Sequence, residues 1–191
     1  MKKTAIIILG YLLLAACVFA SHSLFAQNKN LYSVSMVKPK IDMYNAFETA
    51  WKLHVSKFHK GDNKIMVNEI LSGPYSGYFE FLHGPMSFED MDKERANKSA
   101  HDLDWEKTCA PNLAVETPNN YYRFLDSLSY NGDVKVEKYL VSVTQVKPGK
   151  MGEYQAEVRR GVKLAPIMNN PFSFNRYVQL WSGSDPVMVT L

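Results

Sequence analysis

Histidine and glutamate are the side chains of this chain whose types and positions could do chemistry. His54 falls on the apolar stripe of an amphipathic segment, a position typical of a buried histidine whose ring nitrogens are satisfied by neighbours. His83 follows Phe79 and Phe81 with a period of two, so all three share one face of a strand. In a catalytic pocket, either histidine could accept a proton or polarise a carbonyl group.

Two acids, Glu69 and Glu80, fall inside predicted strands. A carboxylate that faces a dry core is costly, so each should face solvent, an interface, or a polar lumen with a partner. A buried carboxylate could serve as a general base. Because Glu80 and His83 are three residues apart, a regular strand directs them to opposite faces. His54, His83 and Glu80 are therefore alternative catalytic candidates rather than one constellation.

Two further histidines are interpreted without a chemical role. His59 lies off the apolar stripe, near the end of the first helix, where a cation is favourable to the helix dipole. His101 lies beside Asp102 in a highly charged segment, where a solvent-facing position is expected. Metal binding would require several histidines to converge, which spacing alone does not show. We predict neither a metal nor a cofactor.

The composition and the missing motifs exclude several functions. The motifs G-x-x-x-x-G-K-[ST], G-x-G-x-x-G, G-x-S-x-G and H-E-x-x-H do not occur, so phosphate-cradling loops, dinucleotide sites, serine elbows and zincin sites lack their signatures. The net charge is +3, and without Lys2 and Lys3 the balance is 20 basic against 19 acidic side chains. That balance argues against nucleic-acid binding. Cys109 lies near a helix end and is interpreted as structural filler.

The first 26 residues are predicted to be an export signal. Lys2 and Lys3 precede the apolar run 4–20. Signal-peptidase cleavage could follow Ala20 or Ala26. Two alternatives are an uncleaved membrane anchor and lipidation at Cys17, since the segment 14–17 resembles a lipobox. We expect a periplasmic or extracellular protein, which reaches a membrane only if Cys17 is lipidated.

An internal repeat organises the remainder of the chain. Segments 31–39 and 140–148 alternate with period two and end at Lys-Pro, which predicts strands with one apolar face and one small-hydroxyl face. An amphipathic helix and two strands follow in each copy, at 43–58, 64–71 and 77–83, and at 151–165, 174–181 and 186–191.

The first copy continues beyond its third strand. Ser87 and Asp90 form a capping-box pattern before a charged helix over 91–109, a loop over 111–120 and a strand over 121–130. The order is β-α-β-β-α-β, the ferredoxin-like unit. We predict an α+β fold of tandem ferredoxin-like units over 27–133 and 134–191. The second unit is incomplete, so we expect a longer natural protein of about 230 to 240 residues; the alternative is that a partner chain supplies the missing elements.

This tandem unit, with the turn Lys147-Pro148-Gly149-Lys150 before an amphipathic helix, resembles the dimeric α/β-barrel superfamily. That group includes NIPSNAP-like proteins and antibiotic-biosynthesis-type monooxygenases, and the match covers 31–191. The resemblance implies two sheets facing each other across a barrel, an interior pocket and a homodimer. Some relatives bind heme through a helical histidine, for which His101 is the candidate, but a solvent-facing His101 argues against heme here.

Two functions are compatible with these features. The first is an exported protein that binds a small apolar ligand or a partner subunit in a sheet-lined cavity, which the aromatic content of 13% favours. The alternative is a cofactor-independent monooxygenase or isomerase acting on a small aromatic or carbonyl compound through His54, His83 or Glu80. Polar residues that converge in a pocket would favour the second.

Overall fold

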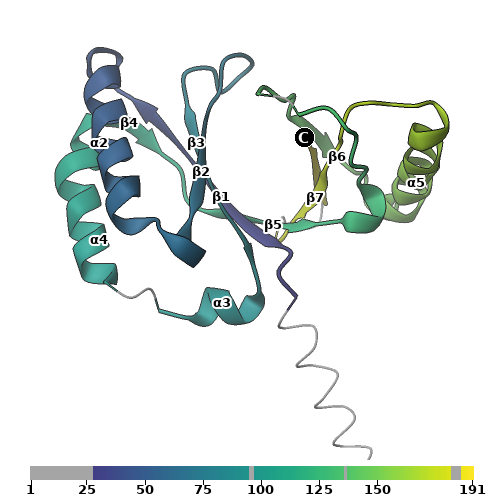
Figure 1. Ribbon diagram of the computed structural model, residues 1–191, viewed down its shortest axis with the longest axis horizontal. Coiled ribbons are helices and arrows are strands. Elements are labelled where there is room, and N and C mark those ends of the chain that lie inside the picture. The colour runs from purple at the N-terminus through teal and green to yellow at the C-terminus, as the bar shows by residue number, and fades with distance from the viewer. Residues whose placement is uncertain (1–27, 95–96, 136, 182–185) are drawn as a thin grey trace, which may run out of the picture.

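The computed structural model describes residues 28–94, 97–135, 137–181 and 186–191. The predicted leader, its cleavage positions and Cys17 lie outside these residues. The described part combines one curled sheet with helices on its outer side (Figure 1), which confirms the predicted α+β class. Within these ranges, no helix is long and apolar enough to cross a lipid bilayer.

The sheet has eight antiparallel strands in the described residues. Their order is β2-β3-β1-β5-β7-β8-β6, and β4 pairs with the end of β1. The pairing of β5 with β7 joins the two halves, and the sheet curls into a half-barrel (Figure 1). The strands are β1 (Leu31–Pro39), β2 (Ile65–Glu69), β3 (Phe79–Met86), β4 (Leu113–Glu116), β5 (Asn120–Phe124), β6 (Ser142–Gln145), β7 (Arg176–Gln179) and β8 (Val187–Thr190).

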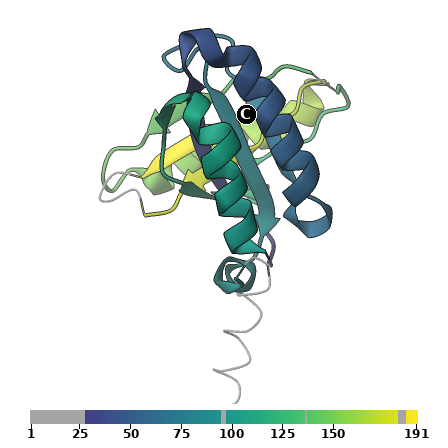
Figure 2. The ribbon, with the colours of Figure 1, turned by 90° about the vertical axis from the view of Figure 1, so that its left-hand side faces the viewer.

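The helices lie on the outside of the half-barrel. Figure 2 shows α2 and α4 side by side across the first half of the sheet, and α5 lies beside the second half in Figure 1. A π-helical turn continues α4 over Trp105–Cys109. The helices are α2 (Tyr44–Phe58), α3 (Phe88–Asp92), α4 (Lys98–Asp104) and α5 (Met151–Ile167).

Each half of the sheet has its own apolar core. Under α2 and α4, Phe47 from the helix stripe packs against Phe79 and Phe81 from β3, and the buried Cys109 completes the cluster. Under α5, the core consists of Leu128, Val146 and Met188. Burying these apolar side chains is the main favourable term that holds α2 and α5 on the sheet.

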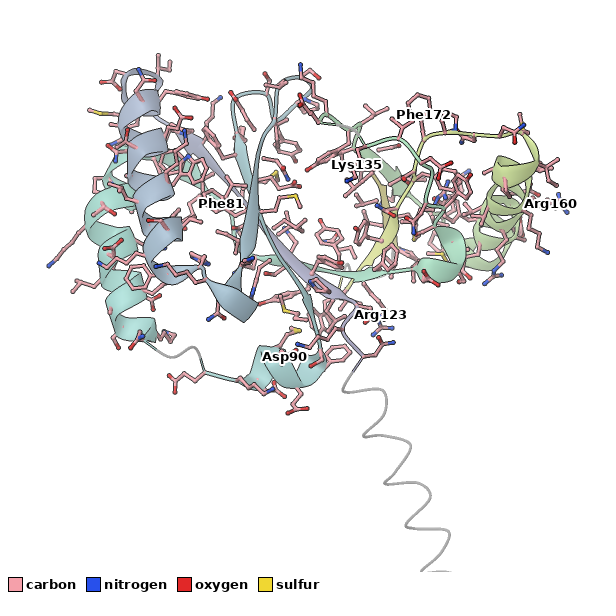
Figure 3. The ribbon with its side chains drawn as sticks, viewed as in Figure 1. Phe81, Asp90, Arg123, Lys135, Arg160 and Phe172 are labelled. Carbon is pink, nitrogen blue, oxygen red and sulfur yellow. The ribbon has the colours of Figure 1, made fainter. Side chains whose placement is uncertain are left out.

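The first strand directs its small hydroxyl face toward the helices. In the pairing of β1 with β3, Ser33 lies opposite His83 and Ser35 lies opposite Phe81. Directly paired residues share a sheet face, and Phe81 points from β3 toward the helices (Figure 3). Small polar side chains thus lie beneath α2 and α4, where a helix-covered sheet usually carries large apolar ones.

The predicted order of elements agrees with the structure, with three local corrections. The predicted loop over 111–120 contains β4, which adds to the end of β1. The predicted helix over 91–109 is not continuous, since α3 ends at Asp92 and α4 begins at Lys98. The predicted strand over 121–130 ends at Phe124. The capping box is confirmed, since the Ser87 side chain accepts from the Asp90 backbone N–H. The division into two ferredoxin-like units stays a prediction.

Candidate functional site

A pocket of about 400 Å³ lies between the first half of the sheet and the helices α2 and α4. Its sheet wall comes from β1, β2, β3 and β4, and its helix wall comes from α2 with its C-cap and from α4 with the π-helical turn. The lining is mostly polar and includes four histidines. The lining residues are Ser33, Ser35, His54, His59, Ile65, Phe81, His83, His101, Asp102, Trp105, Glu106, Glu116 and Asn119.

The small side chains of β1 explain why a pocket exists here. Val37, two residues beyond Ser35 on the same face, is fully packed against the core. The side chains of Ser33 and Ser35 are too short to reach α2. The close packing typical of protein interiors is therefore absent between these two serines and the helix. Volume that side chains leave unfilled forfeits packing contacts, which makes this polar pocket a candidate functional site.

Three of the histidines come together on the helix wall. His54 is on α2 and only 2% exposed, His59 is the C-cap of α2, and His101 is on α4. On a continuous helix, residues five apart point about 140° away from each other. Because α2 ends at Phe58 and His59 leaves the helical path, the rings of His54 and His59 both reach His101.

The Nε2 atoms of these three rings form the point of convergence. His54 Nε2 lies 3.1 Å from His101 Nε2, and His101 Nε2 lies 3.3 Å from His59 Nε2. One ring nitrogen from each of the three residues can be chosen so that all lie within 4.8 Å of one another. Among the described residues, these three histidines are therefore the group that could hold a metal ion.

The opposite nitrogen of each ring contacts an oxygen that can only accept. His54 Nδ1 lies 2.9 Å from a carboxylate oxygen of Asp104, and His101 Nδ1 lies 2.9 Å from one of Asp102. His59 Nδ1 lies 3.2 Å from the backbone carbonyl of Asn63. Each Nδ1 therefore donates its proton to that oxygen, and in the neutral form of each ring Nε2 is the nitrogen left with a lone pair.

Lysine side chains hold both carboxylates in place. Lys57 donates to Asp104 at 2.7 Å, and this bond, followed by the bond from His54, lowers the pKa of Asp104. The bond from His101, followed by the bond from Lys98, lowers the pKa of Asp102. Both carboxylates are thus ionised at neutral pH and act as hydrogen-bond acceptors.

The structure separates the three candidates predicted from the sequence. His54 and His83 line the same pocket. Glu80 lies on the opposite face of β3, where its Oε2 accepts from Asn68 at 3.0 Å and from the Tyr139 hydroxyl at 3.2 Å. The predicted opposition of Glu80 and His83 is therefore observed, and Glu80 takes no part in this pocket.

The interpretation of His101 as a solvent-facing residue is wrong. Its side chain is 16% exposed and turns toward His54 and His59. Sequence reasoning treated 91–109 as one exposed helix, whereas α4 begins anew at Lys98 and so turns His101 inward. The sequence does show three histidines near two predicted helices, and His101 is followed by the potential hydrogen-bond acceptors Asp102 and Asp104.

Cys109 has the structural position that was expected of it. It is fully buried in the core, and burial raises the pKa of its thiol. The thiol is therefore protonated at neutral pH and takes no part in the pocket.

Comparison with known proteins identifies a likeness in fold. No model of a known protein family matches the sequence, and no curated protein matches it. The structure is similar to that of a candidate monooxygenase from Lactobacillus acidophilus NCFM, with a TM-score of 0.52 and 6% sequence identity over 85% of this chain and 76% of that chain. At this identity, the likeness shows a common α+β fold and nothing about the residues of the pocket.

Proposed function

We propose that this chain is an enzyme that binds a small molecule in the pocket between its sheet and the helices α2 and α4. The observation that carries the proposal is the replacement of core side chains by a polar, histidine-rich cavity. Its volume of about 400 Å³ falls in the range of small-molecule sites. Four imidazole rings on two walls provide more acid–base and ligand groups than binding alone requires.

The lining indicates the character of the bound molecule. Hydroxyl, amide, carboxylate and imidazole groups outnumber the apolar contributions of Ile65, Phe81 and Trp105. A compound with several hydrogen-bonding groups therefore fits better than the small apolar ligand expected from the sequence. Trp105 and Phe81 provide flat apolar surfaces for a ring, so the favoured ligand is a small polar aromatic or carbonyl compound.

Support for a reaction class comes from the fold rather than from the site. The similar structure from Lactobacillus acidophilus NCFM is named as a candidate monooxygenase. This supports oxidation of a small organic compound as the first reaction to test, with isomerisation by the pocket histidines as the second. If the leader is an export signal, the reaction takes place outside the cytoplasm.

A pocket-filling substitution tests the proposal. In Ser35→Leu, a larger side chain occupies the floor of the pocket, and Met36→Leu changes the opposite face of the same strand. Thermal-shift screening against small phenols, hydroxybenzoates and keto acids should find binders of the wild-type chain and of Met36→Leu. The same compounds should not shift the melting temperature of Ser35→Leu. Equal binding by both variants would place the ligand site elsewhere, and no binder of the wild type in this set would also reject the proposal.

A further inference from the structure

We propose that His54, His59 and His101 bind one divalent transition-metal ion through their Nε2 atoms, with Zn²⁺ as the representative ion. The inference rests on the proposed function, because the ion would lie in the wall of the same pocket and act on the molecule bound there. The sequence predicted neither a metal nor a cofactor, so the proposal replaces the cofactor-independent reaction with a metal-dependent one.

The spacing of the nitrogen atoms fits a shared ion. A tetrahedral zinc ion with metal–nitrogen bonds of about 2.0–2.1 Å separates two of its nitrogen ligands by about 3.3–3.4 Å. The two measured Nε2 separations are 3.1 Å and 3.3 Å. A hydrogen bond between two rings accounts for one such contact, whereas three Nε2 atoms that face one another also fit one shared ion. The side chains therefore need only small shifts to surround an ion.

The orientation of the rings gives a second argument. The Nδ1 atoms contact Asp104, Asp102 and the Asn63 carbonyl, so the nitrogen that each histidine turns toward the other two is Nε2. Two unprotonated nitrogens at such a distance repel, whereas a proton or a metal ion between them makes the contact favourable. One extra proton can bridge a single pair of nitrogens, whereas a metal ion accepts all three lone pairs at once.

The outer contacts of the rings match those of metal-binding histidines. Such histidines donate their other N–H to a carboxylate, a backbone carbonyl or water, which fixes the ring orientation and raises its basicity. Here the acceptors are two carboxylates and one carbonyl. Lys57 and Lys98 hold the carboxylates, and the negative charges of Asp104 and Asp102 favour a divalent cation nearby.

The protein ligands leave room for a further ligand from the pocket. Three histidines with one open position are typical of catalytic zinc, whereas structural zinc sites are closed by four protein ligands. All three histidines line the pocket, so water or a bound compound can reach the ion. Imidazole also suits iron, copper and nickel, so the same geometry admits a redox-active metal.

Zinc titration of the purified full chain tests the proposal. After treatment with a chelator, isothermal titration with ZnCl₂ should show one equivalent bound. His59→Gln and His101→Gln should each weaken binding at least 100-fold. Both side chains are half-buried and polar replacements fit there, so the variants should fold, which circular dichroism checks. Glu157→Gln, on the remote helix α5, removes one exposed acid and should bind zinc like the wild type.

The outcomes separate the metal site from the proposed function. No zinc binding, or wild-type binding by both folded histidine variants, overturns the metal site. If the histidine variants unfold, an X-ray absorption spectrum of the zinc-loaded wild type decides. Three nitrogen ligands at about 2.0–2.1 Å support the site, and a shell of oxygen ligands alone rejects it. Zinc binding without any small-molecule binding rejects the proposed function alone, and the reverse result rejects the metal site alone.

Discussion

Replacing Asp104 by asparagine tests how the histidine cluster is held. The carboxylate lies 2.9 Å from Nδ1 of the buried His54 and 2.7 Å from Lys57 Nζ. Asparagine has nearly the same shape, but its oxygen accepts without a full charge and its NH₂ group faces a second donor. The change therefore weakens the hydrogen bond from His54, which loses its charged acceptor, and breaks the one from Lys57.

The magnitude follows from these two contacts. A hydrogen bond to a charged group contributes about 1.5–3 kcal/mol, against about 0.5–1.5 kcal/mol for a neutral one. The Lys57 side chain is 62% exposed, so its contact adds little, and the loss at His54 dominates. We expect Asp104→Asn to lower the free energy of unfolding of the metal-free protein by about 1–1.5 kcal/mol, or Tm by roughly 2–6 °C. Zinc affinity should fall by about 10–100-fold.

Urea unfolding of the metal-free protein and zinc titration measure the two effects separately. Glu48→Gln is the matched control, because it removes a partly exposed acid from α2, the helix that carries His54, and breaks its i,i+4 pair with Lys52. Asp102→Asn should have a smaller effect on stability, since Asp102 is 45% exposed whereas Asp104 is 17% exposed. Wild-type zinc affinity in a folded Asp104→Asn protein would refute the assigned role of this carboxylate.

Three further predictions concern the surrounding fold. Ser35→Leu should raise Tm by a few degrees in thermal unfolding, because burying a leucine contributes about 1.5–3 kcal/mol where there is room; a lower Tm would mean that the floor of the pocket is already packed. Tyr139→Phe removes the hydrogen bond to Glu80 and should lower the free energy of unfolding in urea by about 0.5–1 kcal/mol. Its zinc affinity should equal that of the wild type, because Glu80 lies on the opposite face of β3. A change in zinc affinity would contradict that separation. The pKa of Asp90 is lowered, chiefly by the backbone hydrogen bond at Ser87, so its ionised form stabilises the folded state above its ordinary pKa of 3.8 and this contribution disappears as pH falls through the lower folded value. Asp90→Asn should accordingly be less stable than the wild type near pH 7, and equal stability of the two proteins at that pH would refute the capping role.

Local patterns in the sequence predict most of the fold. Alternation over 31–39 identifies β1, the stripe containing Phe47 and His54 identifies α2, and the repeat locates their counterparts in the second half. The predictions fail where tertiary contacts decide. β4 has only four residues and becomes a strand by pairing with the end of β1, a long-range contact that local propensity does not report.

The candidate site was predicted only in part, for a similar reason. Period two directs His83 inward, and the helix stripe directs His54 inward, so the sequence identifies one residue from each wall of the pocket. The contributions of His59 and His101 depend on where α2 ends and where α4 begins. Helix ends shifted by a few residues rotate side chains by hundreds of degrees, so spacing alone could not bring these rings together.

Anomalous diffraction from crystals of the full chain soaked in ZnCl₂ tests the central claim most directly. Data collected on both sides of the zinc absorption edge should show one strong peak in the pocket. The peak should lie about 2.0–2.1 Å from Nε2 of His54, His59 and His101, with Nδ1 of each ring still bonded to its present acceptor. A peak confined to surface carboxylates, or no peak in the pocket at full zinc occupancy elsewhere, would contradict the account.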